Sequence, residues 1–445
     1  MPLTGEQRKA KIDLIRQGKS VGQVKIPYRD KSSYEVEVFQ IPWDAVIYNQ
    51  FNDRIGLSLK TKLNPLGTEG LTHEYDEYLH DLIDKELWES AVSANKLTLK
   101  SMQGKEKGMP GEQLEAGIIT ADGVIVDGNR RAMIAKRAGK TFFLAGVLDD
   151  LYEGNEEILR DLETQLQFSV ESKVDYNPLE KYFKIKTHVE KFGKSYSDLA
   201  KLMGPKYSEN KLEDMHKIAD LMDDYLAFID SPGCYDLLLI SGTTDSKENA
   251  FLTLHTKLKQ MESGSFATDD YDYSNFSDSY RSIMFNFIRT EAVASPQDYP
   301  KYLSNKVGTG LFRSEEFKDE MVKKVGEIMN EPVMELPSIR DLKEDPKNKG
   351  LQDIDLVKQR ESRIREQTKD KMSELMKEMI GKRLYTSKKL KPFERIEKAL
   401  QELALIKDED MDSLAESDGE NLDNLKNQMT EMQRKVNLIK KSLGM

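Results

Sequence analysis

The sequence predicts an α+β N-terminal domain, followed by all-α helical domains and a C-terminal helix or coiled coil. Three observations predict this fold class. Short apolar runs bounded by turn residues lie in the first 147 residues and are typical of strands. From residue 180 onward the apolar side chains follow the 3.6-residue period of amphipathic helices. A heptad pattern occupies residues 421–445.

A β-hairpin is predicted by two short apolar strands, at residues 118–120 and 124–126. Asp122 and Gly123 separate them, and an Asp-Gly pair between apolar runs is a strong hairpin signal. A third apolar run, at residues 141–147, predicts another buried strand. The strands of the α+β domain are therefore expected around this hairpin.

Between the hairpin and the third strand lies Asp-Gly-Asn-Arg-Arg, at residues 127–131. It begins a predicted helix that Gly139 ends. Gly128 at the junction allows the backbone to approach a ligand closely, and the first-turn N–H groups have no helical partner. Because Arg130 and Arg131 stand beside them, we expect an anion site, most plausibly for phosphates. An ordinary tight turn with two solvated arginines is the alternative.

The Gly128-Asn129-Arg130-Arg131 box resembles the Gly-x-x-Arg box of the ParB/sulfiredoxin superfamily, in which the turn and its arginines grip the phosphates of a nucleotide. Two further stretches resemble the same family. Residues 41–56 are similar to its opening strand and arginine box, with Arg54 at the arginine position. Residues 165–182 are similar to its Asp-x-Asn-Pro segment, with Lys173 at the position of a phosphate-contacting arginine. The resemblance covers residues 35–230 and implies a ParB/sulfiredoxin-like N-terminal domain.

The resemblance also implies a set of site residues. The phosphates of a nucleoside triphosphate, CTP or ATP, would be bound by Arg54, Gly128, Asn129, Arg130, Arg131 and Lys173. Glu171 and Asp175 are the candidates for a Mg²⁺ ligand, since hard oxygen donors suit that ion. If the pocket instead transfers phosphoryl groups as an NTPase or nuclease, Asp127 or Asp175 would orient the attacking group. A scaffold with a decayed pocket is the third hypothesis.

Residues 180–229 resemble the helix-turn-helix module that follows this domain in the same proteins. Tyr196–Met203 is the expected first helix of the motif, and Ser208 is the expected N-cap of a second helix that reaches about Met222. The first six residues of the second helix carry three carboxylates, on Glu209, Glu213 and Asp214. Because carboxylates repel phosphate, the pattern favours a helical packing module over a helix that reads DNA bases.

The composition changes along the chain predict its organisation. We expect an α+β domain at 1–160 with an insertion at 57–116, a helix-turn-helix-like module at 161–232, a helical domain at 233–345, a basic helical region at 346–407, an acidic linker at 408–420 and a heptad helix at 421–445. In the basic region, Lys388, Lys389 and Lys391 are the best candidates for contacts with the DNA backbone, and a solvated helix face is the alternative. The heptad predicts a homodimer, since partition proteins dimerise through their C-terminal part, or a helix docked on the body.

Composition excludes several classes of protein. No apolar run reaches the ~20 residues of a membrane span and no signal peptide opens the chain, so we expect a cytoplasmic protein with no membrane partner. Cys234 is the single cysteine, which excludes a disulfide framework. The five histidines show no ligand spacing with one another or with cysteine, so a transition-metal site is not expected. A net charge of −11 restricts any DNA contact to a local basic patch.

Overall fold

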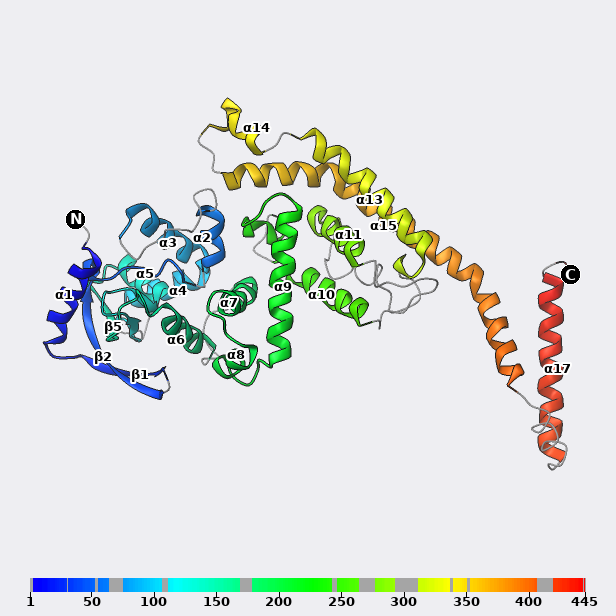
Figure 1. Cartoon of the computed structure of the whole chain (residues 1–445), viewed down its shortest axis with the longest axis horizontal. Coiled ribbons are helices and arrows are strands. Elements are labelled where there is room, and N and C mark those ends of the chain that lie inside the picture. Colours follow the sequence, from blue (N-terminus) through cyan, green and yellow to red (C-terminus); the bar gives the residue numbers. More distant parts are fainter. Residues whose placement is uncertain are drawn as a thin grey trace. The chain divides into compact units, whose positions relative to one another are not determined.

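The chain is described from a computed structural model, and structural statements refer to the residues that it places. These are residues 3–29, 31–52, 55–63, 75–105, 111–168, 178–241, 246–263, 277–292, 311–336, 339–349, 353–405, 419–442 and 444. They form two compact units, one of residues 1–305 with 310–377, and one of residues 306–309 with 378–445. Figure 1 labels the elements of both units.

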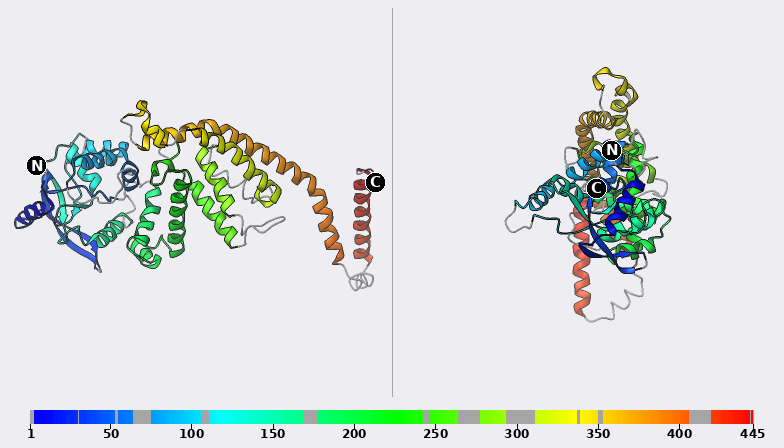
Figure 2. Two further views of the ribbon diagram at one scale, coloured as in Figure 1. Left: turned by 45° about the horizontal axis from the view of Figure 1, so that its top comes forward. Right: turned by 90° about the vertical axis from the view of Figure 1, so that its left-hand side faces the viewer.

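The first unit contains a mixed sheet with the strand order β1-β2-β5-β3-β4. Its strands are β1 (Gly22–Tyr28), β2 (Lys31–Pro42), β3 (Gly117–Ile119), β4 (Ile125–Asp127) and β5 (Phe142–Val147). Neighbouring strands are antiparallel except β3 and β5, which are parallel. β1 and β2 run side by side as a long ribbon (Figures 1 and 2). This sheet confirms the α+β class of the N-terminal region at the level of architecture.

The predicted hairpin is the β3–β4 pair, and its turn shows why a glycine is needed. Gly123 has φ +83°, and a Cβ on it would lie 2.1 Å from the carbonyl oxygen of Ala45. The Thr120 hydroxyl closes the turn by accepting a hydrogen bond from the Val124 N–H at 3.0 Å. Larger residues at position 123 would therefore meet both backbone strain and a clash.

Helices cover both faces of the sheet. They are α1 (Gly5–Arg16), α2 (Gly56–Leu63), α3 (Glu77–Glu89), α4 (Val92–Met102), α5 (Asn129–Arg137) and α6 (Glu156–Phe168), with a 3-10 turn η1 (Trp43–Ala45). Ile119 of β3 packs into a core with α1, α3 and α5, whereas its neighbour Ile118 packs into a second core with α6. Alternate side chains of one strand thus serve the two faces.

The rest of the first unit is helical. Its helices are α7 (Pro178–Glu190), α8 (Tyr196–Met203), α9 (Glu209–Phe228), α10 (Glu248–Glu262), α11 (Ser277–Thr290), α13 (Glu315–Glu335), α14 (Ile339–Glu344) and the start of α15 (Asp353–Ala404), with 3-10 turns η3 (Tyr235–Leu238), η5 (Leu311–Arg313) and η6 (Pro346–Asn348). The predicted first helix of the motif is α8, with the predicted bounds. Ser208 caps α9 as predicted, by accepting a hydrogen bond from the Lys211 N–H at 3.3 Å.

Within the predicted insertion at 57–116, α3 and α4 are separate helices, because the chain turns at residues 90 and 91. One helix prediction differs from the structure. The second helix of the motif continues to Phe228 instead of about Met222, since Leu221, Met222 and Tyr225 remain buried on one face of α9. The helical period therefore persists for another turn and a half past the expected end.

The second unit holds the end of α15 and α17 (Gly419–Ser442). Lys388, Lys389 and Lys391 lie on α15, and their side chains are outside the described part of the chain, as are residues 408–418 of the expected acidic linker. The heptad side chains Met429 and Met432 on α17 are 57% and 44% exposed. No described helix is long and apolar enough to cross a membrane.

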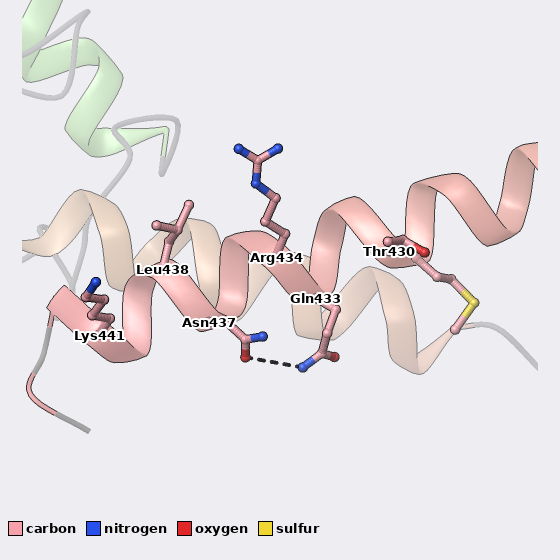
Figure 3. Close-up of a pocket in the computed structure, with 7 residues that line it drawn as sticks. Thr430, Gln433, Arg434, Asn437, Leu438 and Lys441 are labelled. Atoms are coloured by element: carbon pink, nitrogen blue, oxygen red, sulfur yellow. Dashed lines mark hydrogen bonds between the residues drawn. The ribbon is translucent and has the colours of Figure 1, made fainter.

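A hollow of about 700 Å³ runs along α17, and Figure 3 shows the side chains that line it. They include Arg434, Leu438 and Lys441, and all of them come from this one helix. One face of a single helix cannot enclose a small molecule, so this hollow is part of the exposed surface of the second unit and not a ligand site.

Candidate functional site

Asn129, the second residue of the Gly-Asn-Arg-Arg box, ties the box to the loop that follows η1. Its side chain is 2% exposed. The Oδ1 atom accepts a hydrogen bond from the Asn49 N–H at 2.9 Å, and Nδ2 donates to the Ile125 carbonyl at 3.0 Å. Asn49 in turn accepts a hydrogen bond from the Phe51 N–H at 3.0 Å. Both the oxygen and the nitrogen of the Asn129 side-chain amide are therefore engaged inside the protein, so this side chain positions the box.

Glu180, from the Asp-x-Asn-Pro-like segment, ties α7 to the same loop. Its carboxylate accepts a hydrogen bond from the Leu57 N–H at 3.2 Å, in the first turn of α2. A carboxylate at a helix N-terminus is stabilised by the unpaired N–H groups and by the helix dipole. A second link joins Asn52 to Glu163 of α6, at 3.1 Å. Three segments that are distant in sequence thus meet around residues 49–57.

A cavity of about 80 Å³ lies where these segments meet. Its described lining includes three cationic side chains, those of Lys60, Arg160 and Lys184, and one carboxylate, that of Glu180. Even when Glu163 behind Arg160 is counted, these cations outnumber the carboxylates. The cavity is smaller than the roughly 300–1,000 Å³ of sites for small molecules, but its charge suits an anion.

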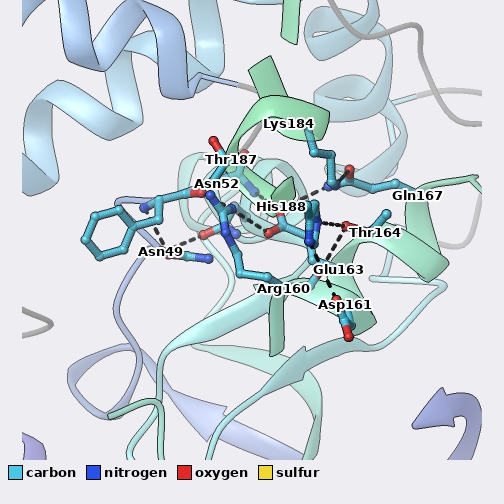
Figure 4. Close-up of polar contacts among 12 residues, drawn as sticks. Asn49, Asn52, Arg160, Asp161, Glu163, Thr164, Gln167, Lys184, Thr187 and His188 are labelled. Atoms are coloured by element: carbon cyan, nitrogen blue, oxygen red, sulfur yellow. Dashed lines mark hydrogen bonds and ion pairs between the residues drawn. The ribbon is translucent and has the colours of Figure 1, made fainter. Parts of the chain in front are cut away.

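The wall of the cavity is a buried polar network (Figure 4). Glu163 is 1% exposed, and its carboxylate accepts hydrogen bonds from Asn52 at 3.1 Å, Gln167 at 3.0 Å and Arg160 at 3.1 Å. Arg160 also donates to the carbonyl of Phe51. Because several donors from different elements meet on this one carboxylate, the network holds the loop, α6 and the cavity wall in one arrangement.

Next to this network, Thr164, His188 and Asp161 have the spacing of a nucleophile with its base. Thr164 Oγ1 lies 3.0 Å from His188 Nε2, and His188 Nδ1 lies 3.6 Å from Asp161 (Figure 4). Burial raises the pKa of Asp161 against the opposing effect of Lys194. However, Thr164 is 0% exposed and donates its hydroxyl to the Arg160 carbonyl at 2.8 Å. No substrate can reach this hydroxyl, so the three residues are a packing contact between α6 and α7.

The N-terminus of α5 retains the features of an anion site. Gly128 is the N-cap of the helix with φ +99°, and as a glycine it offers no side-chain cap. A Cβ on Gly128 would lie 3.2 Å from the Gly117 Cα, so the close approach that demands glycine is made by the protein's own β3. A helix N-terminus directs its first-turn N–H groups and the positive end of the helix dipole outward, which favours an anion.

The two arginines of the box point to different partners. Arg130 donates from Nε to Asn95 Oδ1 at 2.5 Å, on α4 of the expected insertion. Arg131 donates to the Ala116 carbonyl at 2.7 Å and to the Glu115 carboxylate at 2.8 Å. The Glu115 side chain is 76% exposed, and a surface ion pair of this kind contributes little to stability. A bound anion can therefore replace Glu115 as the partner of Arg131.

The other predicted site residues are less completely placed. Asp127 is half-buried, with its carboxylate 4.0 Å from the Arg131 guanidinium. Arg54, Glu171, Lys173 and Asp175 lie outside the described residues.

Sequence reasoning did not find Arg160, Glu163 or Lys184, which supply most of the charge around the cavity. Their only signal was the spacing of Arg160, Glu163 and Gln167 on one face of a helix, which is equally typical of a solvated surface. In comparisons with known proteins, no family model matches this chain and no curated protein matches it in sequence.

Proposed function

We propose that this protein binds a nucleoside triphosphate through its N-terminal domain and acts on DNA, in the manner of ParB-like proteins. The observation that supports the proposal is the meeting of the three motif segments. The box at 128–131, the loop at 49–57 and Glu180 of α7 are joined by buried hydrogen bonds, although up to 123 residues separate them in sequence. Residues of the loop and Glu180 line the cavity, and the box is joined to the same loop by the Asn129–Asn49 hydrogen bond.

Phosphate recognition would come from two sources. The N-terminus of α5, with Arg131 beside it, would provide the positive end of the helix dipole and a guanidinium. Arg160 and Lys184 provide positive charge at the cavity. Charge-assisted hydrogen bonds of these kinds are the strongest that side chains make with phosphate.

Coupling between the nucleotide and the helical module would pass through Glu180. This residue belongs to α7, and it accepts a hydrogen bond from the first turn of α2 beside the cavity. A nucleotide that enters the cavity would compete with or reinforce this contact. A ligand shifts a conformational equilibrium only if it binds one conformation more tightly than the other. The conformations with and without the Glu180–Leu57 hydrogen bond would differ in their affinity for the nucleotide.

The size of the cavity sets a condition on the proposal. At about 80 Å³ it has room for part of a nucleotide and not for the whole molecule. Binding would therefore widen the space between α2, α6 and α7. The expected signature is a change in the environment of the loop at 49–57 when nucleotide is added.

Titration of the purified full-length protein with CTP, ATP and GTP tests nucleotide binding directly. Calorimetry should detect binding of one of them, and Arg131→Ala should weaken it at least tenfold, since a charge-assisted phosphate contact contributes roughly 1.5–3 kcal/mol. Arg137→Ala is the matched control, because this arginine of α5 pairs with Asp84 and stacks on Trp88, away from the helix N-terminus. If both variants bind like the wild type, the phosphate site is not at this box. Phosphate release in the same samples separates a binding protein from an NTPase.

The DNA part of the proposal rests on the basic segment of α15. Changing Lys388, Lys389 and Lys391 to Glu should weaken binding to any DNA sequence and flatten its dependence on salt, because each neutralised phosphate contributes about one unit to the salt slope. Changing Asn210 and Lys211 of α9 to Ala should matter much less. Loss of binding to one particular sequence in the second variant would instead identify α9 as the DNA reader.

A further inference from the structure

A second polar cluster lies in the helical module, on the facing sides of α7 and α9. It consists of Glu190, the last residue of α7, and of His216 and Asp220, which are four residues apart on α9. His216 Nε2 lies 3.4 Å from the Glu190 carboxylate and 3.8 Å from the Asp220 carboxylate. One imidazole nitrogen and two carboxylate oxygens therefore converge from two helices.

These distances suit a metal ion. Zn²⁺ binds imidazole nitrogen and carboxylate oxygen at roughly 2.0–2.2 Å, which places the ligand atoms of a tetrahedral site about 3.3–3.6 Å apart. The measured 3.4 Å and 3.8 Å are close to that spacing. The other ring nitrogen, Nδ1, lies 2.9 Å from the Tyr196 hydroxyl of α8. A metal-binding histidine typically has such a hydrogen-bonding partner on its second nitrogen, which fixes the ring orientation.

The charge of the cluster also calls for a cation. Lys186 lies among the carboxylates, with Nζ 2.7 Å from Asp220, 2.8 Å from Asp223 and 3.6 Å from Glu190. One ammonium among three carboxylates leaves an excess of two negative charges in this group when His216 is neutral. A divalent ion would balance that excess, while Lys186 kept its contact with Asp223.

We infer that Glu190, His216 and Asp220 form a Zn²⁺ site that joins α7 to α9. Imidazole as a ligand favours Zn²⁺ over Mg²⁺, which prefers oxygen donors and retains its water. With three protein ligands, one coordination position remains for water. The ion would hold together the helices that flank α8, and so stabilise the helix-turn-helix-like module independently of any nucleotide.

Titration of metal-free, full-length protein with zinc chloride tests the inference. The wild type should bind one equivalent at this site and unfold at a higher temperature with zinc than without it. His216→Gln should weaken this binding roughly tenfold or more and abolish the thermal shift, and Asp220→Asn should do the same. His255→Gln is the matched control, since His255 is 3.0 Å from a single carboxylate, that of Asp214, and should bind zinc like the wild type.

Lys186→Met distinguishes a metal site from a network of ion pairs. Removing the ammonium leaves the carboxylates without their cation, so zinc affinity should rise. The inference is overturned if the wild type binds no zinc, if His216→Gln and His255→Gln bind it equally, or if Lys186→Met binds it more weakly. Circular dichroism of each variant establishes that it is folded. If His216→Gln does not fold, Asp220→Asn still provides the test.

Discussion

Replacing Asn129 by Ala should destabilise the N-terminal domain much more than an ordinary substitution on the same helix. The change leaves the Asn49 N–H and the Ile125 carbonyl without the buried partner that each now has at 2.9 Å and 3.0 Å. A buried group that loses its partner costs about 1–3 kcal/mol. The better helix propensity of Ala returns roughly 0.5 kcal/mol. Two such groups together cost about 2–6 kcal/mol, so we expect the free energy of unfolding to fall by about 1.5–5.5 kcal/mol.

Urea unfolding followed by tryptophan fluorescence measures this effect in the relevant domain. Both tryptophans of the chain, Trp43 and Trp88, lie in the N-terminal domain, so their emission reports its unfolding and not that of the helical modules. Lys136→Ala is the control, because Lys136 is an exposed residue of the same helix and its loss should change stability by less than about 0.5 kcal/mol. Equal midpoints for Asn129→Ala and Lys136→Ala would refute the structural role assigned to the Asn129 amide.

Three further predictions follow from particular contacts. Burial, together with Lys136, lowers the pKa of His80 to about 4. Because the unfolded chain takes up the proton more readily, the folded protein should lose stability as pH falls from about 6.5 toward 4. Unfolding temperatures across this range should show the loss in the wild type and not in His80→Phe. Arg289→Ala should cost about 3–5 kcal/mol in urea unfolding, because the buried Glu361 carboxylate loses two hydrogen bonds of 2.7 Å and keeps only the longer 3.5 Å contact with Arg360 among its described ion pairs. An Arg289→Met/Glu361→Leu double variant should be more stable than the single one. Deleting residues 421–445 should convert a dimer to a monomer in light scattering, since the heptad seam is exposed on α17; a monomeric full-length protein would contradict this.

The parts of the fold that the sequence predicted are those with strong local signals. Asp122 and Gly123 predicted the β3–β4 hairpin, because few residues tolerate the backbone that this turn requires. Ser208 predicted the start of α9, which it caps with its side chain, and caps of this kind mark helix starts reliably. In each case a few adjacent residues determine the local conformation.

The strand order and the cavity could not be predicted in the same way. β1 pairs with β2, and β2 pairs with β5, which begins a hundred residues later, so the order depends on long-range packing. The hydrogen bond from Leu57 to Glu180 likewise joins residues 123 positions apart, and neither residue carries a local signal of the contact. The resemblance pointed to the segments that meet, but not to Arg160 and Glu163 that build the wall.

The Glu190-His216-Asp220 cluster shows a different limit of sequence reasoning. Spacing of histidines and cysteines along the chain argued against a transition-metal site. The structure instead combines one histidine with carboxylates from two helices, and Glu190 is 26 residues from His216. Asp and Glu are so frequent in this chain that their positions alone do not single out a ligand set.

Hydrogen exchange with and without saturating nucleotide tests the central claim most directly, because it locates binding along the whole chain. The proposal predicts slower amide exchange at three places, residues 49–57, residues 128–131 and the start of α7 around Glu180. It also predicts no change in α17. Unchanged exchange at all three segments in the presence of a nucleotide that binds, or protection confined to other elements, would show that they do not form the nucleotide site.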